Sequence, residues 1–221
     1  MTRRRFGAIA LVPAIALLGF GAAALGNPQA HADAHNAGAT RTAFHDAMRV
    51  LWEDHIVWTR QFIVSAATEK KNLPDTGPTV DRLLANQTHI GNAIKPFYGD
   101  AAGDALTKLL REHILTAADI IAAAKAGDDA AVDTAVTAWY ANADAIATFL
   151  SEANPQNWPL DEMKAHMKSH LDLTLEEAVA RLEGRYADDI AAYDKVHADI
   201  LEMADMLSDG IIAQFPSSFA R

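Results

Sequence analysis

The chain has 221 residues, of which 50% are apolar and 22% charged, a balance typical of a globular protein and unlike that of a disordered or collagen-like chain. It contains no cysteine, which excludes disulfides, a thiol nucleophile, thiolate metal sites and covalent c-type haem. The formal net charge of -10 argues against a nucleic-acid partner, because phosphate binding depends on clustered Lys and Arg.

The first 32 residues have the pattern of an export signal. Three arginines at positions 3–5 precede an apolar run over residues 6–25, and Ala30-His31-Ala32 supplies the small residues that a signal peptidase reads. The arginines also resemble a twin-arginine signal, so both the Sec and the twin-arginine routes stay open. Proline and glycine interrupt the apolar run, which favours a cleaved signal over a membrane anchor.

We therefore expect three parts: a cleaved signal peptide over 1–32, a flexible mature N-terminus over 33–41 and one domain over 42–214. The mature protein is expected in the periplasm, at the cell surface or secreted, with no stable membrane insertion.

After residue 40 the pattern is helical, because no segment alternates apolar and polar residues as a strand does. Turn signals rich in Pro and Gly separate six predicted helices, over residues 42–68, 79–95, 102–125, 129–152, 159–183 and 185–213. We expect an all-α, up-and-down antiparallel bundle of four long helices plus one or two additional helices. The last break is placed at Gly184, although a capping box at Thr174 offers an alternative start for the final helix.

Four histidines occupy positions in the apolar stripes of four different predicted helices: His55, His113, His170 and His197. Antiparallel neighbours lie level at equal distances from the turn that joins them. His170 and His197 are nearly equidistant from Gly184, and the other two fall at a similar level. The sequence therefore predicts four imidazoles in one layer of the core.

A buried imidazole brings polar atoms that an apolar layer cannot satisfy, at about 1–3 kcal/mol for each unpaired group. A shared ligand or a closed polar network is therefore required. Neutral imidazole is a preferred ligand of transition metals, so we predict a buried metal site, with copper favoured over zinc or iron. A haem pocket and a metal-free histidine network are the alternatives. Di-iron is disfavoured because the chain has no Glu-x-x-His motif.

Other side chains are candidates to support this site. Met163 and His166 share a helix face with His170, and a thioether beside imidazoles suits copper. Three polar residues are candidates to orient the imidazoles by hydrogen bonding: Asn142, Tyr193 and Asp194.

A second copper site depends on the point of cleavage. If the signal is cut after residue 32, the new terminus is Asp33-Ala34-His35, which resembles the amino-terminal copper and nickel motif of serum albumins. The amine, two deprotonated amides and the imidazole can enclose Cu(II) or Ni(II) in a square plane.

Five segments resemble a family of exported bacterial all-helical proteins of unsettled function, some of which carry the labels glycosyltransferase or acetylglutamate kinase. The segments are residues 51–55, 91–96, 139–144, 170–174 and 203–210. The resemblance implies an exported helical fold. The sequence gives those enzymatic labels no support, since it has no Gly-rich phosphate loop.

The leading functional hypothesis is an exported metal-binding bundle that acts in metal handling or sensing outside the cytoplasm. One alternative is a redox metalloenzyme or haem protein that uses the same histidines around an open coordination position. The other is a metal-free structural or interaction module whose histidines form a network in the core.

Overall fold

The computed structural model describes residues 41–68 and 71–219. These contain no strand, so the prediction of an all-α protein is confirmed. Six long helices and one short 3-10 helix follow one another: α2 (Arg41–Ala66), α3 (Thr76–Tyr98), α4 (Asp100–Ala126), α5 (Asp129–Ala153), α6 (Leu160–Leu182), α7 (Tyr186–Gln214) and η1 (Pro216–Phe219).

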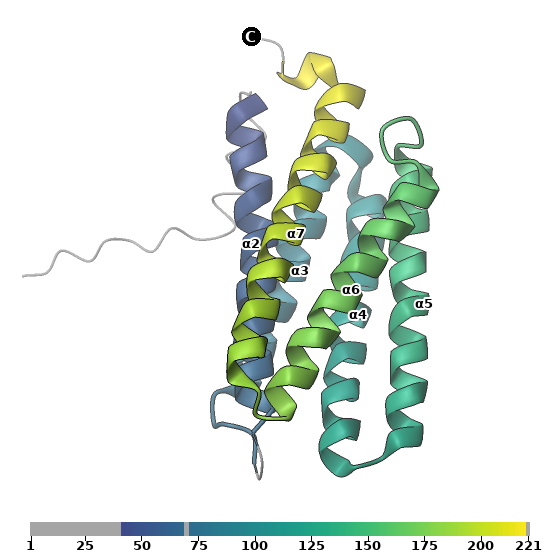
Figure 1. The fold of residues 1–221 in the computed structure, drawn as a ribbon. Helices are drawn as coiled ribbons and strands as arrows, with labels where there is room; N and C mark the ends of the chain where they lie inside the picture. Colours follow the sequence, from purple (N-terminus) through teal and green to yellow (C-terminus); the bar gives the residue numbers. More distant parts are fainter. Residues whose placement is uncertain (1–40, 69–70, 220–221) are drawn as a thin grey trace, which may run out of the picture.

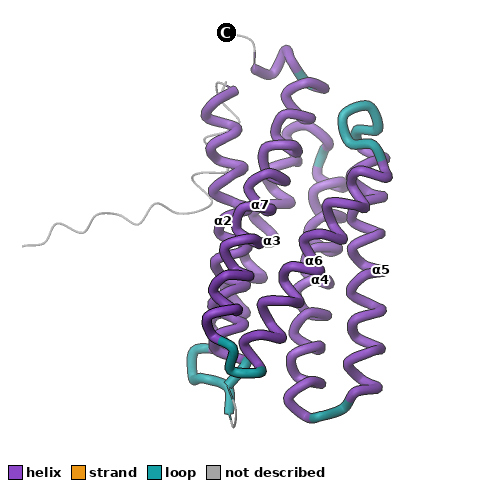
Figure 2. Tube along the Cα trace, viewed as in Figure 1, coloured by secondary structure: helices purple, strands orange, loops and turns teal. Residues whose placement is uncertain are grey.

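The six helices run in alternate directions and are joined by short turns (Figures 1 and 2). Each helix packs against its neighbours in the chain, and α7 returns to lie beside α2, which closes a ring of six. All six have between 23 and 29 residues. The expected division into four long helices and one or two extra ones is therefore not seen among them.

Two turns show why the predicted boundaries fall where they do. Gly127 and Gly184 have φ of 68° and 72°, in the left-handed region that glycine adopts at the C-terminal end of a helix. The predicted break at Gly184 is confirmed. By contrast, α3 extends past both predicted ends, because Pro78 lies in its first turn, where no N–H partner is needed, and Pro96 falls in its last turn.

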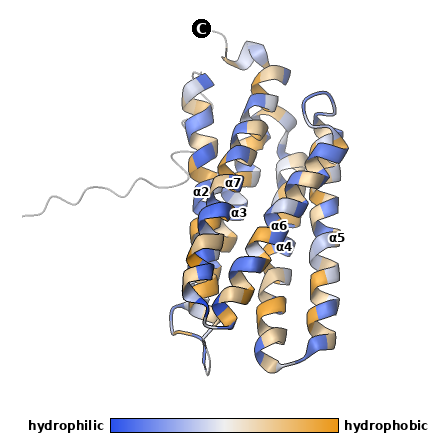
Figure 3. Ribbon diagram, in the orientation of Figure 1, coloured by the Kyte–Doolittle hydropathy of each residue, from blue (hydrophilic) through white to orange (hydrophobic). Residues whose placement is uncertain are grey.

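The core is apolar along most of the ring, and the apolar faces of the helices alternate with hydrophilic ones (Figure 3). A larger cluster contains Trp52, Trp139 and Met167, and a smaller one contains Phe62 and Ile114. No helix in the described part of the chain is long and apolar enough to cross a membrane. The predicted signal peptide and the Asp33-Ala34-His35 segment lie outside the described residues.

Candidate metal centre

Three of the four predicted histidines meet inside the ring. His55 on α2, His113 on α4 and His170 on α6 are only 2–3% exposed. The ring centroids of His55 and His170 are 5.9 Å apart, and those of His113 and His170 are 6.2 Å apart. The three imidazoles come from α2, α4 and α6, which alternate with the other helices around the bundle and all run in the same direction (Figure 1). The structure thus brings three imidazoles to one level.

The three imidazoles line a cavity of about 10 Å³. Two thioethers, those of Met167 and Met203, line it as well. The remaining walls are apolar or aromatic: Trp52, Leu110, Ile146 and Leu150. A volume of this size suits one water molecule or one ion. It leaves no space for a porphyrin, so the haem alternative gains no support.

A chain of buried amides fixes the tautomer of His55. The Nδ1 atom of His55 lies 3.2 Å from Gln87 Oε1. Gln87 Nε2 donates to the carbonyl of Leu83 and to Asn86 Oδ1, at 2.9 and 3.1 Å. Its oxygen therefore faces the imidazole as an acceptor, so Nδ1 of His55 carries the proton and donates. The lone pair of this imidazole is consequently on Nε2.

His113 is held in the same way from the opposite side of the cavity. Its Nδ1 atom lies 3.0 Å from Asn142 Oδ1, and Asn142 Nδ2 donates to the carbonyl of Leu109 at 3.1 Å. The amide oxygen is again the acceptor, so Nε2 of His113 also carries a lone pair. No hydrogen bond among the described residues engages Nε2 of either ring. Hydrogen bonding of one ring nitrogen is how proteins orient a metal-binding imidazole.

His170 differs from the other two because its Nδ1 atom is buried without a hydrogen-bond partner. Oδ2 of Asp199 lies 3.8 Å from it and is likewise buried without a partner. The other oxygen of Asp199 accepts a hydrogen bond of 3.0 Å from Ser169 Oγ. A small movement would bring His170 and Asp199 into the carboxylate–histidine pairing that accompanies many bound metals.

All three imidazoles are neutral near pH 7. Burial lowers the pKa of His55 to about 4. Burial, followed by repulsion from His55, lowers the pKa of His113 to about 3. The pKa of His170 falls well below its ordinary value, again through burial and then through its two imidazole neighbours. Metal binding requires unprotonated imidazole, so no proton has to be displaced from these rings.

The rings stand slightly further apart than direct ligation of one ion requires. With metal–nitrogen bonds of about 2.0–2.1 Å, the centroids of two imidazoles on a tetrahedral ion lie about 5 Å apart. Within the described residues, no group of three or more His, Asp or Glu side chains is close enough to hold an ion as it stands. The surface of the cavity is apolar, with no imidazole nitrogen in it. The rings would therefore have to turn as well as approach each other to hold an ion.

His197 does not join the cluster, which corrects the expectation of four imidazoles in one layer. Its side chain is 32% exposed, and its Nε2 atom lies 3.0 Å from Glu53 Oε1 on α2. The buried face of α7 passes through Val196 instead. Its contact with Glu53, two residues before His55 on α2, places His197 near the level of His55, but its side chain points away from the cluster.

The other predicted residues take different places. Asn142 orients His113, as described above. Met163 is buried in the core but is not among the residues that line the cavity, and His166 is half-buried near Asp199. Tyr193 contacts the tilted ring of His197 and lies under the guanidinium of Arg60. Asp194 is exposed, so neither Tyr193 nor Asp194 orients the three buried rings.

Sequence reasoning missed four residues at this site: Met167, Met203, Gln87 and Asp199. Met167 lies one turn before His170 on the same face of α6, a spacing that could have pointed to it. Gln87 and Asp199 gave no such signal, because a polar residue in a helix is ordinarily assigned to the surface.

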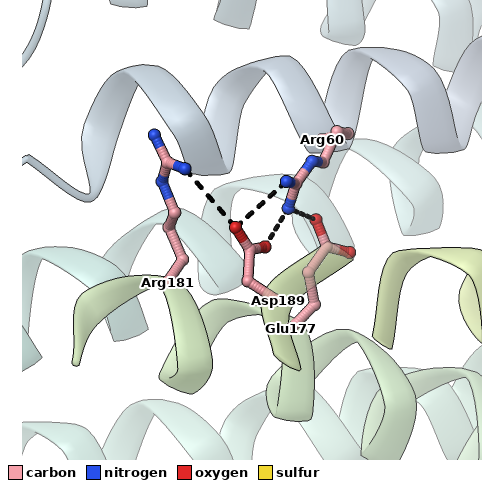
Figure 4. A network of polar contacts seen from close by, with 4 residues as sticks. All are labelled: Arg60, Glu177, Arg181 and Asp189. Carbon is pink, nitrogen blue, oxygen red and sulfur yellow. Dashed lines mark hydrogen bonds and ion pairs between the residues drawn. The ribbon is translucent and has the colours of Figure 1, made fainter. Parts of the chain in front are cut away.

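A second buried polar cluster lies beside the histidines and joins α2, α6 and α7 (Figure 4). Arg60 binds both Glu177, at 2.9 Å, and Asp189, and Arg181 approaches Asp189 at 3.4 Å. Both carboxylates are fully buried. Burial raises the pKa of Glu177 to about 7 despite the ion pair. The two arginines of this cluster balance the charges of its two carboxylates, although Oε2 of Glu177 has no hydrogen-bond partner. The cavity lined by three imidazoles is the better candidate for a ligand.

Comparisons with protein-family models, with curated proteins and with solved structures found no match for this chain. Its function is therefore inferred from the geometry of the cavity.

Proposed function

We propose that this protein binds a single copper ion, as Cu(I), between His55, His113 and His170, and that it handles copper outside the cytoplasm. The observation that carries the proposal is the convergence of three neutral imidazoles and two methionines on one cavity of about 10 Å³. The arginine-led apolar segment at the start of the chain supports an extracytoplasmic role.

The kind of donor atom favours Cu(I) over the other metals. Thioethers such as those of Met167 and Met203 are soft ligands that select Cu(I), and imidazole suits it too. All five donors are uncharged at neutral pH, and burying a charge becomes much more costly as the charge increases. A monovalent ion is therefore preferred to Zn(II) or Fe(II), and Asp199 supplies one negative charge next to His170.

Binding needs the rings to turn and His170 to approach each of the other two imidazoles by about 1 Å, given metal–nitrogen bonds of about 2.0–2.1 Å. Two features support such a movement. The unpaired Nδ1 of His170 and the unpaired Oδ2 of Asp199 would both gain a partner if the two groups approached each other. Methionine is flexible enough to follow the ion, since it has three rotatable bonds.

Storage or transfer of copper fits this cavity better than catalysis does. A metalloenzyme needs an open coordination position that a substrate can reach. The walls formed by Trp52, Leu110, Ile146 and Leu150 enclose a volume of about 10 Å³, which accommodates an ion and no substrate.

The test is anaerobic competition for Cu(I) between the protein and a coloured chelator, bathocuproine disulfonate. We expect the protein to withdraw about one ion per chain, and we expect His113→Leu to abolish this uptake because one of the three imidazoles is lost. His197→Leu is the matched control and should bind as the wild type does. Cu(I) also avoids interference from Asp33-Ala34-His35, which would take Cu(II) or Ni(II).

Failure of the wild-type protein to withdraw Cu(I) would overturn the proposal. So would equal uptake by the wild type and His113→Leu. A metal-free histidine network would then remain, and His113→Leu would be tolerated because Leu is a common core residue.

A further inference from the structure

A groove on the surface lies directly outside the histidine cavity. It is formed between α5 and α6 and has a volume of about 340 Å³. Its lining residues are Tyr140, Ala141, Ala143, Asp144, Lys164, Ala165, Met167 and Lys168. Met167 lines the buried cavity as well. Met167, which is 6% exposed, thus lines both the cavity and the groove.

The groove exists because small residues face each other along the two helices. Ala141, Ala143 and Ala165 leave space that longer side chains would fill. Met167 consequently borders the groove, although only 6% of the residue is exposed. Methionine changes rotamer readily, which allows one side chain to contact both spaces in turn.

The charges at the groove do not repel a cation. Lys164 Nζ lies 3.5 Å from Asp144 Oδ2, and Lys168 Nζ lies 2.5 Å from Asp172 Oδ2. Each lysine at the rim is therefore matched by a carboxylate. The apolar cavity walls from α4 and α5 are Leu110, Ile146 and Leu150, which offer no donor atom to a passing ion.

We propose that Cu(I) reaches the three-histidine site through the groove between α5 and α6, and that Met167 carries it across the wall. This inference rests on the proposed function. The step is a ligand exchange: a copper–sulfur bond to Met167 forms as the bond to the external donor breaks. Met167 then turns inward with the ion, and bonds to the imidazoles complete the site. Copper stays in the +1 state, and no proton moves because Nε2 of His55 and of His113 already carries a lone pair.

Stopped-flow transfer of Cu(I) from bathocuproine disulfonate to the full chain tests the route. Met167→Leu keeps the apolar volume and removes the sulfur, and we expect it to slow loading by about tenfold or more because the intermediate ligand is lost. Met163→Leu is the matched control. It removes a buried thioether of the same helix that lines neither the cavity nor the groove, so it should load at the wild-type rate.

A second variant tests the groove itself. Ala165 is exposed on α6, so Ala165→Trp obstructs the groove without disturbing the core. We expect slower loading and an unchanged final stoichiometry. Ala187→Trp, at an exposed position of α7 away from the groove, should load at the wild-type rate.

The outcomes separate the route from the site. Wild-type loading rates in both Met167→Leu and Ala165→Trp, with normal stoichiometry, would overturn the route and leave the site intact. Absence of uptake by the wild type would overturn the proposed function and the route together. Slow loading in these two variants, with the two control variants at the wild-type rate, would support the route.

Discussion

Acid should destabilise the metal-free protein, and His113 should account for a measurable part of the effect. Its imidazole is 3% exposed, and burial lowers its pKa to about 3. In the unfolded chain the same group titrates near pH 6.5. A group whose pKa is depressed in the folded state stabilises the fold above the unfolded pKa, and this contribution is lost as the pH falls towards the folded value.

The magnitude follows from these two pKa values. At pH 5 the unfolded chain has bound a proton at His113 and the folded protein has not, so the free energy of unfolding is lower than at pH 7 by about 2 kcal/mol. His55 and His170 act in the same direction. Glu177 acts in the opposite direction, because its pKa is raised to about 7. Its contribution is present below its ordinary pKa and is lost as the pH rises through 7.

The contribution of His113 to the pH dependence of the free energy of unfolding is isolated by comparing variants. Urea unfolding of chelator-treated protein is measured at pH 7 and at pH 5 for the wild type, His113→Leu and Met203→Leu. We expect the wild type to lose about 2 kcal/mol more than His113→Leu between these pH values, since the effect of Glu177 cancels in the difference. Met203→Leu changes the same cavity without changing a titratable group, so it should follow the wild type. Equal losses in the wild type and His113→Leu would refute the assignment of His113 as a buried neutral imidazole.

Three further stability predictions can be checked by urea unfolding at pH 7. Arg60→Met leaves two buried carboxylates without their main partner and should cost about 3–5 kcal/mol. Gly91→Ala would make a Cβ overlap the carbonyl of Gly103 where α3 and α4 cross, at a cost of about 1–3 kcal/mol; Gly77→Ala, with open space around it, is its control. Gly184→Ala places an L side chain at φ 72° and should cost about 1 kcal/mol.

The helices were predictable because their ends are set by local chemistry. Gly127 and Gly184 stop α4 and α6 through left-handed turns, which the sequence signals directly. The sequence predicts the C-terminal end of α3 too early, at residue 95, because Pro96 follows it and proline is a common signal for the end of a helix. A proline in the last turn removes one hydrogen bond and does not prevent the chain from continuing as helix to Tyr98.

The candidate site was predicted in part, and the error at His197 has a physical cause. Tyr186 and Ile190 share the helix face of His197 by their spacing, and an apolar face is expected to point inward, yet the two residues are 57% and 56% exposed. The buried face instead contains Asp189 and Val196. Sequence patterns assign a carboxylate to the surface. Here Asp189 is buried because a partner from another helix neutralises it, and this tertiary pairing rotates the first half of α7 away from the expected phase.

The same pairing explains how three histidines stay level in a bundle without disulfides. Arg60 follows His55 on α2 by about one and a half turns, and Glu177 follows His170 on α6 by about two turns. Because α2 and α6 run in the same direction, the ion pair of 2.9 Å between Arg60 and Glu177 fixes the relative height of the two helices, and with it that of the two imidazoles. Apolar packing tolerates sliding along a helix far better than a buried charge pair does, since separating the pair leaves charges unmatched in the core. The charged cluster lies outside the cavity, yet it fixes the relative height of the helices that carry His55 and His170.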